Sequence, residues 1–110
     1  MNRWGIAAEP EAKVRKRDKR CVYCRAVMKG SALATGGRKS TATWEHIDNN
    51  VRNRSENNVV RRCGSCNSSK GVRKLTEWLD SEYCRQEKID HRTVALVVRK
   101  WLREQRETKK

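Results

Sequence analysis

The sequence predicts a small α+β domain, with two strands and a helix at its centre and further helices on both sides. Two patterns lead to this class: a strand pattern on each side of a polar loop in mid-chain, and helical spacing of apolar residues after it. The core must be thin, because only 35% of the 110 residues are hydrophobic and none is Phe. Such a core usually needs an additional cross-link.

The N-terminal part predicts a short basic helix. In EPEAKVRKRDKR, residues 9–20, Pro10 suits a first helical turn, and the acidic start and basic end complement the helix dipole. The residues before it carry a short apolar patch without a cleavage pattern, so we expect no signal peptide. We therefore place the chain in a cytoplasm, where its five cysteines should stay reduced.

The middle of the chain predicts a β-hairpin. Residues 30–43 are rich in Gly, Ser and Thr, and the sequence STATWEH, residues 40–46, suits an extended strand. The segment IDNNVRNRSENN, residues 47–58, has no periodicity and is interpreted as a polar loop. The segment NVVRRC, residues 58–63, then forms the second strand.

The C-terminal half predicts two helices. The first runs from about residue 67 to 83, and its apolar residues recur at helical spacing: Val72, Leu75, Trp78, Leu79 and Tyr83. The second follows Asp90, a suitable N-cap, and has one apolar stripe: Val94, Val97, Val98, Trp101 and Leu102. We interpret both stripes as core, His91 as a surface residue in the first turn of the second helix, and residues 103–110 as a frayed tail. With no internal repeat or domain boundary, residues 1–110 form one predicted domain.

Two Cys-x-x-Cys pairs predict a structural metal site. Four thiolates in a reducing compartment are the donor set of a closed tetrahedral zinc site: Cys21, Cys24, Cys63 and Cys66. Because 38 residues separate the pairs, one shared ion would close a long loop. An iron–sulfur centre or a redox dithiol are the alternatives. We interpret Cys84 as a half-buried apolar residue rather than a fifth ligand.

The sequence TWEHID, inside this loop, contains a candidate site. Glu45 is a hard oxygen ligand and His46 a possible general base, but adjacent strand residues point to opposite faces, so both serve one site only if the backbone leaves strand geometry there. The cysteine cluster would bring this strand close to the helix expected to begin at Asn67, where a carboxylate and an amide oxygen can share a magnesium-type ion. Taken singly, a surface Glu-His pair is usually solvated and such an Asn is usually a helix cap.

The charge indicates a polyanionic partner. Lys and Arg number 27 against 13 acidic residues, a net charge of +14, and nucleic acid is the simplest partner for so basic a small protein. A membrane surface is a weaker interpretation, because the basic residues are dispersed and no apolar run approaches the length of a spanning helix.

Together, these residues resemble the HNH endonucleases, the ββα-metal nuclease family, in their zinc-stapled four-Cys form. The match covers residues 21–71: a Cys-x-x-Cys pair, then WEHIDNN, ENNVVRRC and CGSCNSSKG. The resemblance implies a ββα-metal (HNH) core stapled by a four-Cys zinc site, with flanking N-terminal and C-terminal helices, the latter a helical extension over residues 72–104. It also implies a bacterial or phage-infected cell as the setting.

The resemblance assigns catalytic roles. His46 is implied as the general base that activates water, and Glu45 and Asn67 as the ligands of a catalytic Mg²⁺ or Mn²⁺ ion. Asn58 is implied as the middle asparagine, which braces the loop after the catalytic His. The family usually has Asp or His where Glu45 stands, so Asp48 is an alternative ligand.

The implied reaction is phosphodiester hydrolysis. The resemblance predicts a metal-dependent DNA endonuclease that leaves 5′-phosphate and 3′-hydroxyl ends. Lys70, Arg61 or Arg62 is a candidate to neutralise the phosphate, although simple contact with the nucleic-acid backbone is the more ordinary role for each.

A single small domain has no separate module for reading sequence, so we expect low specificity on double-stranded or branched DNA. The oligomeric state is left open. The alternative is a non-catalytic zinc-dependent nucleic-acid-binding module. Such a module does not require the set Glu45, His46, Asn58 and Asn67.

Overall fold

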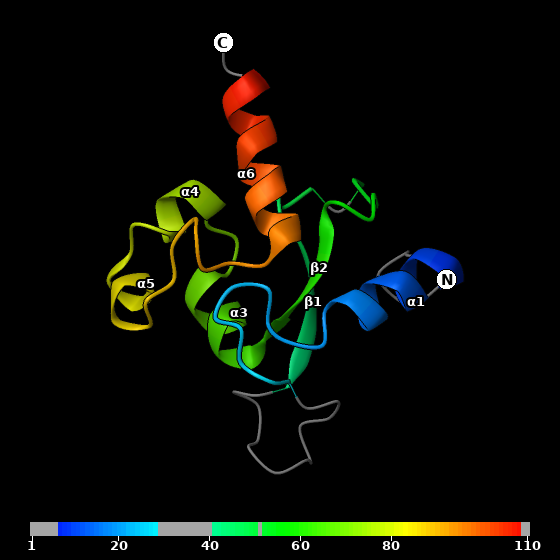
Figure 1. Cartoon of the computed structure of the whole chain (residues 1–110), viewed down its shortest axis with the longest axis horizontal. Helices are drawn as coiled ribbons and strands as arrows, with labels where there is room; N and C mark the ends of the chain where they lie inside the picture. The colour runs from blue at the N-terminus through cyan, green and yellow to red at the C-terminus, as the bar shows by residue number, and fades with distance from the viewer. Residues whose placement is uncertain (1–6, 29–40, 51, 109–110) are drawn as a thin grey trace.

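The structure, a computed structural model, is a small α+β fold and describes residues 7–28, 41–50 and 52–108. Two antiparallel strands, β1 (Ala42–His46) and β2 (Val59–Cys63), lie at its centre with helices around them (Figure 1). The helices are α1 (Ala8–Arg17), α3 (Gly64–Lys70), α4 (Leu75–Trp78), α5 (Glu82–Gln86) and α6 (Leu96–Thr108). None of the helices in these ranges is long and apolar enough to cross a membrane.

The predicted basic helix is present as α1, with Pro10 in its first turn. It ends at Arg17, earlier than expected, because the next residues leave helical geometry and attach the helix to β2. The Arg17 guanidinium donates to the backbone carbonyls of Glu56 and Val59 at 2.8 and 2.9 Å. The buried Asp18 carboxylate accepts from the backbone N–H of Arg61 at 3.2 Å. These contacts fix α1 against the second strand.

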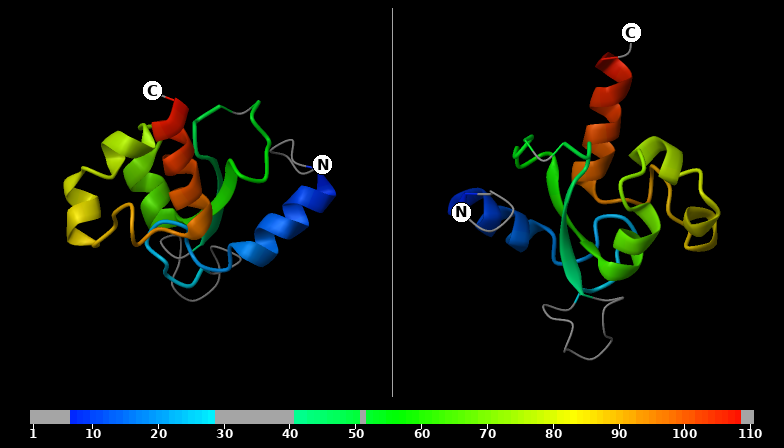
Figure 2. Two further views of the ribbon diagram at one scale, coloured as in Figure 1. Left: turned by 45° about the horizontal axis from the view of Figure 1, so that its top comes forward. Right: turned by 180° about the vertical axis from the view of Figure 1, so that it is seen from behind.

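The predicted hairpin is confirmed, with His46 opposite Val59 and Ala42 opposite Cys63. Of the segment rich in Gly, Ser and Thr, residues 30–40 lie outside the described residues. Because directly opposite residues share a face of the sheet, Glu45 and Arg62 lie on one face and Trp44 and Arg61 on the other. Figure 2 shows α1 on one side of the hairpin and α4 and α5 on the other.

The single helix predicted over residues 67–83 is wrong. Three short helices, α3, α4 and α5, cover this stretch and its flanks. Gly71 ends α3 with a φ of 52° and a ψ of −127°, a conformation that residues with a side chain rarely adopt. Ser81 then starts α5 as an N-cap that accepts from the backbone N–H of Cys84 at 3.3 Å. As a result Val72, predicted to be core, is 86% exposed.

The helix predicted after Asp90 begins later, at Leu96. The Asp90 carboxylate does act as a cap, but of a separate turn: it accepts from the backbone N–H groups of Arg92 and Thr93 at 2.7 and 3.1 Å. His91 is exposed, as expected, and lies in this turn rather than in α6. The backbone of the predicted frayed tail is helical as far as Thr108.

The core joins the N-terminal cysteine turn to the hairpin and to the C-terminal helices. Its buried members include Tyr23, Ile47, Val60, Leu75, Trp78, Val94 and Val98. The Tyr23 and Trp78 rings meet edge to face, with centroids 5.0 Å apart. Cys84 is fully buried rather than half-buried, and burial raises the pKa of its thiol. The far end of α6 projects beyond the other elements (Figures 1 and 2).

Candidate functional site

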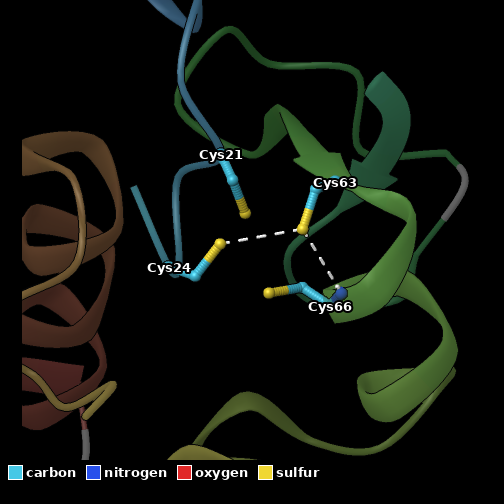
Figure 3. A group of neighbouring side chains, drawn as sticks. All are labelled: Cys21, Cys24, Cys63 and Cys66. Atoms are coloured by element: carbon cyan, nitrogen blue, oxygen red, sulfur yellow. Dashed lines mark hydrogen bonds between the residues drawn. The ribbon is translucent and has the colours of Figure 1, made fainter. Parts of the chain in front are cut away.

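The four predicted metal ligands form one cluster, shown in Figure 3. Cys21 and Cys24 come from the turn after α1, Cys63 ends β2, and Cys66 lies in α3. Their sulfur atoms all lie within 4.8 Å of one another, and the Sγ atoms of Cys24 and Cys63 are 3.7 Å apart. The five cysteines are free thiols, and Cys84 is not a member of the cluster.

The backbone on each side of the cluster is held in a tight turn. In the first pair, the Cys21 N–H donates to the Ala26 carbonyl at 2.9 Å, and Arg25, with a φ of 66°, donates back to Cys21 at 3.0 Å. In the second pair, the Cys63 sulfur caps α3 by accepting from the backbone N–H of Cys66 at 3.5 Å. Both turns direct their sulfur atoms toward the same point (Figure 3).

This donor set fits a tetrahedral metal ion. With zinc–sulfur bonds of about 2.3 Å, the sulfurs of a tetrahedral site are about 3.8 Å apart, close to the Cys24–Cys63 separation. Hydrogen bonding from the Cys24 thiol lowers the pKa of Cys21 to about 7, so this thiol loses its proton more readily than an isolated cysteine does. The four cysteines can therefore hold a metal ion such as zinc.

Glu45 is at the centre of a buried ion-pair network beside this cluster. Its carboxylate accepts hydrogen bonds from the Tyr23 hydroxyl, from Arg62 Nη1 and, at 2.6 Å, from Lys70 Nζ. The Glu45 and Lys70 side chains are 2% and 0% exposed. Burial and the Glu45 charge raise the pKa of Tyr23, which keeps its hydroxyl a donor. One carboxylate therefore carries two cationic partners in a nearly closed interior.

Asn67 joins the same network through Arg62. The Oδ1 atom of Asn67 accepts from Arg62 Nη2 at 2.5 Å, while Nη1 of the same guanidinium bonds Glu45. Asn67 is the fourth residue of α3, not the first residue of a helix as predicted, because Gly64 starts the helix directly after Cys63. Glu45 and Asn67, the two predicted metal ligands, thus face the same position, which the Arg62 guanidinium occupies.

His46 lies on the other face of the sheet. It pairs in register with Val59, so the strand stays regular through Glu45 and His46, and their side chains point to opposite faces. The departure from strand geometry that would let both residues serve one site does not occur there; it follows His46. The His46 side chain is mostly buried, and its Nε2 atom has no hydrogen-bond partner in the described part of the chain. Burial lowers the pKa of His46, although Asp48 and Glu45 oppose this effect.

The loop after His46 is braced by Asn58. The Asn58 amide accepts from the Asp48 backbone N–H at 3.1 Å and donates to the Asp48 carboxylate at 3.0 Å and to the Asn53 carbonyl at 2.9 Å. These are the contacts of a residue that holds the loop. Asp48 also accepts from Asn50 N–H and from the Asn53 amide, so both of its carboxylate oxygens serve the loop.

The three predicted phosphate-binding residues lie in different surroundings. Lys70 is fully buried and Arg62 nearly so, and both are bonded to Glu45, so neither presents a cation to solvent. Arg61 is half-buried, with its guanidinium 5.3 Å from the Trp44 ring centroid; Arg15 of α1 lies over the same ring at 5.2 Å. Arg61 is therefore the member of this set with access to an external anion.

Sequence reasoning missed Tyr23 and Trp44. Tyr23 stands between the first two cysteines, and its hydroxyl donates to the Glu45 carboxylate. Trp44 directly precedes Glu45 in β1, so its side chain lies on the opposite face of the sheet, where Arg15 of α1 contacts the ring. The alternation of strand residues could have indicated this contact. No protein-family model, curated protein or solved structure matches the chain.

Proposed function

We propose that the protein is a metal-dependent DNA endonuclease of the HNH type, with a structural zinc ion in the four-cysteine cluster. One observation carries the proposal: a carboxylate from β1 and an amide oxygen from α3 meet at a single cationic group, next to four clustered thiols. Glu45 and Asn67 supply these oxygens, and the sequence order of strand, loop, strand and helix is that of the family it resembles. The proposed substrate is double-stranded or branched DNA in a bacterial or phage-infected cytoplasm.

The residues divide the proposed work between them. Glu45 and Asn67 would hold Mg²⁺ or Mn²⁺, with Asp48 as the alternative carboxylate, and their hard oxygen atoms suit either ion. When bound, the ion would polarise the scissile phosphate and stabilise the departing 3′ oxygen. His46 would accept a proton from water. Because His46 lies on the face of the sheet opposite Glu45, this step requires the end of β1 to leave strand geometry. Asn58 holds the loop that follows His46. Arg61 contacts a phosphate of the DNA backbone.

The net charge of +14 leads to a prediction about binding. We expect DNA affinity to fall steeply with salt and to differ little among unrelated duplexes, because neutralised phosphates release counterions whatever the bases are. Titration of several duplexes at rising salt measures this. A preference for one sequence that persists at high salt would contradict the expectation and indicate base-edge recognition.

The metal ligands can be separated by substitution. We expect Asn67→Ala to weaken Mn²⁺ binding and to lower cleavage by about 10²-fold, with partial recovery at raised Mn²⁺, because an amide ligand is lost while the fold is kept. Glu45→Gln should behave alike. Both Glu45→Gln and Glu45→Ala remove the counter-charge of two buried cations, but Glu45→Gln is preferable because it keeps the side-chain volume and an oxygen that accepts from Arg62 and Lys70. Asp48→Asn is the matched substitution at the alternative ligand.

Mn²⁺ affinity and cleavage are measured together on zinc-loaded variants. If Glu45→Gln remains active and binds Mn²⁺ while Asp48→Asn does neither, the carboxylate ligand is Asp48. That outcome would place the ligand on the loop that follows His46.

The proposed activity itself is tested on supercoiled plasmid. Zinc-loaded protein should convert it to nicked and linear forms when Mg²⁺ or Mn²⁺ is present and not when both ions are left out. Protein that binds DNA but never cuts plasmid, linear duplex, single strands or branched DNA with any divalent ion would leave only the binding function.

A second candidate is the non-catalytic zinc-dependent nucleic-acid-binding module. Two observations favour it: Glu45 is already neutralised by Arg62 and Lys70, and His46 faces the opposite side of the sheet. A pure binding module has no need to open this network, so its DNA affinity would be unchanged by Asn67→Ala.

A further inference from the structure

Arg62 has an unusual place in the buried network. Its guanidinium bonds both Glu45 and Asn67: Nη1 donates to the Glu45 carboxylate and Nη2 to the Asn67 amide oxygen. The Arg62 side chain is 8% exposed and that of Glu45 is 2% exposed. A guanidinium between a carboxylate and an amide oxygen fills the position that a small cation with the same two ligands would take.

We propose that Arg62 is an internal competitor for the divalent cation. Its guanidinium occupies the position between Glu45 and Asn67 and must leave before an ion gains both oxygens. This inference rests on the proposed function, because it takes Glu45 and Asn67 as the ligands. It adds a positioning residue that sets how readily the site accepts the ion.

Lys70 cannot play the same part. Its ammonium donates to Glu45 Oε1, the atom that also accepts from Arg62, and its side chain is fully buried. Lys70 therefore stays with Glu45 whether or not the position between the two oxygens is filled. Together with the Tyr23 hydroxyl, it keeps the carboxylate paired after Arg62 departs.

Arg62 is also held less completely than its two strong bonds suggest. Its Nε atom is buried and has no hydrogen-bond partner among the described residues. A buried donor without a partner is unfavourable. When the guanidinium moves out, the Nε–H group can bond water, and this offsets part of the free energy lost with the two hydrogen bonds. Asn67 is only half-buried, so the network lies close to the protein surface on that side.

The test compares Mn²⁺ affinity, by electron paramagnetic resonance, in zinc-loaded wild-type protein, Arg62→Gln and the matched control Lys70→Met. Both substitutions remove one positive charge beside the same carboxylate oxygen, but only Arg62→Gln clears the position between Glu45 and Asn67. We expect Arg62→Gln to tighten Mn²⁺ binding by about tenfold or more, and by clearly more than Lys70→Met does. Adding Asn67→Ala to Arg62→Gln should remove most of the gain.

The outcomes separate the inference from the proposed function. Mn²⁺ binding that is unchanged or weaker in Arg62→Gln, or equal gains in both variants, would overturn the role of Arg62 while leaving the metal site in place. Absence of Mn²⁺ binding in wild type and in both variants would overturn the site itself. Should Arg62→Gln lose its zinc or fold, Arg62→Lys serves instead: it keeps the charge but cannot bond both oxygens, and a gain in Mn²⁺ affinity is still expected.

Discussion

Removal of the metal from the four-cysteine cluster is expected to unfold the protein. The cluster ties the turn at Cys21 and Cys24 to the junction of β2 and α3, and three of its four sulfurs belong to buried residues of a thin core. Structural zinc contributes about 10–16 kcal/mol in comparable small sites. That is comparable to the whole stability of a typical domain, about 5–15 kcal/mol. Purified protein should therefore contain about one zinc ion per chain and lose its circular dichroism signal when a strong chelator removes it.

Cys84 provides the control for this experiment. Cys66→Ser should abolish zinc retention, whereas Cys84→Ala, outside the cluster but equally buried, should lower stability only by the cost of a small core cavity and keep the zinc. A chain that is folded, fully reduced and metal-free would contradict the account of the cluster as the metal-dependent link between the Cys21–Cys24 turn and the junction of β2 and α3.

Substitution of His46 is expected to have the largest effect on activity. His46→Gln should lower DNA cleavage by about 10²–10⁴-fold, because the side chain that accepts the proton from water is lost. Zinc content and DNA affinity should stay close to wild type, since His46 is not a member of the thiol cluster. His46→Gln is preferred to His46→Ala because it fills more of the nearly buried space that the imidazole occupies.

The second histidine is the matched control. His91 is exposed in the turn before α6, so His91→Gln should cleave like wild type. Cleavage rates, melting temperature and zinc content are measured on the three proteins. Full activity in His46→Gln would assign the base to another residue, and loss of zinc or of the fold would give His46 a structural role instead.

The parts of the fold that follow from local patterns were predictable. The alternation around the polar loop predicts the hairpin, and the spacing of Val98 and Leu102 predicts the buried face of α6. The two cysteine pairs predict the cluster, because four thiols are the donor set of one shared metal ion.

The rest depends on contacts that local patterns do not contain. The break after α3 results from the backbone angles of Gly71, while the apolar spacing of the segment still reads as one helix. The network around Glu45 joins residues 17 to 25 positions away in the sequence, and nothing near Glu45 indicates that Arg62 and Lys70 approach it. The sequence predicts both as residues that contact phosphate, and charged side chains are seldom fully buried.

The most direct measurement of the proposed activity is the sealing of its nicks by DNA ligase. Supercoiled plasmid is treated with zinc-loaded protein and Mg²⁺, and the nicked product is purified and incubated with ligase alone. Hydrolysis that leaves 5′-phosphate and 3′-hydroxyl ends predicts closed circles again, without any prior treatment of the ends. Plasmid that is never nicked, or nicks that ligase does not seal, would contradict the assignment of this chain as an HNH-type endonuclease.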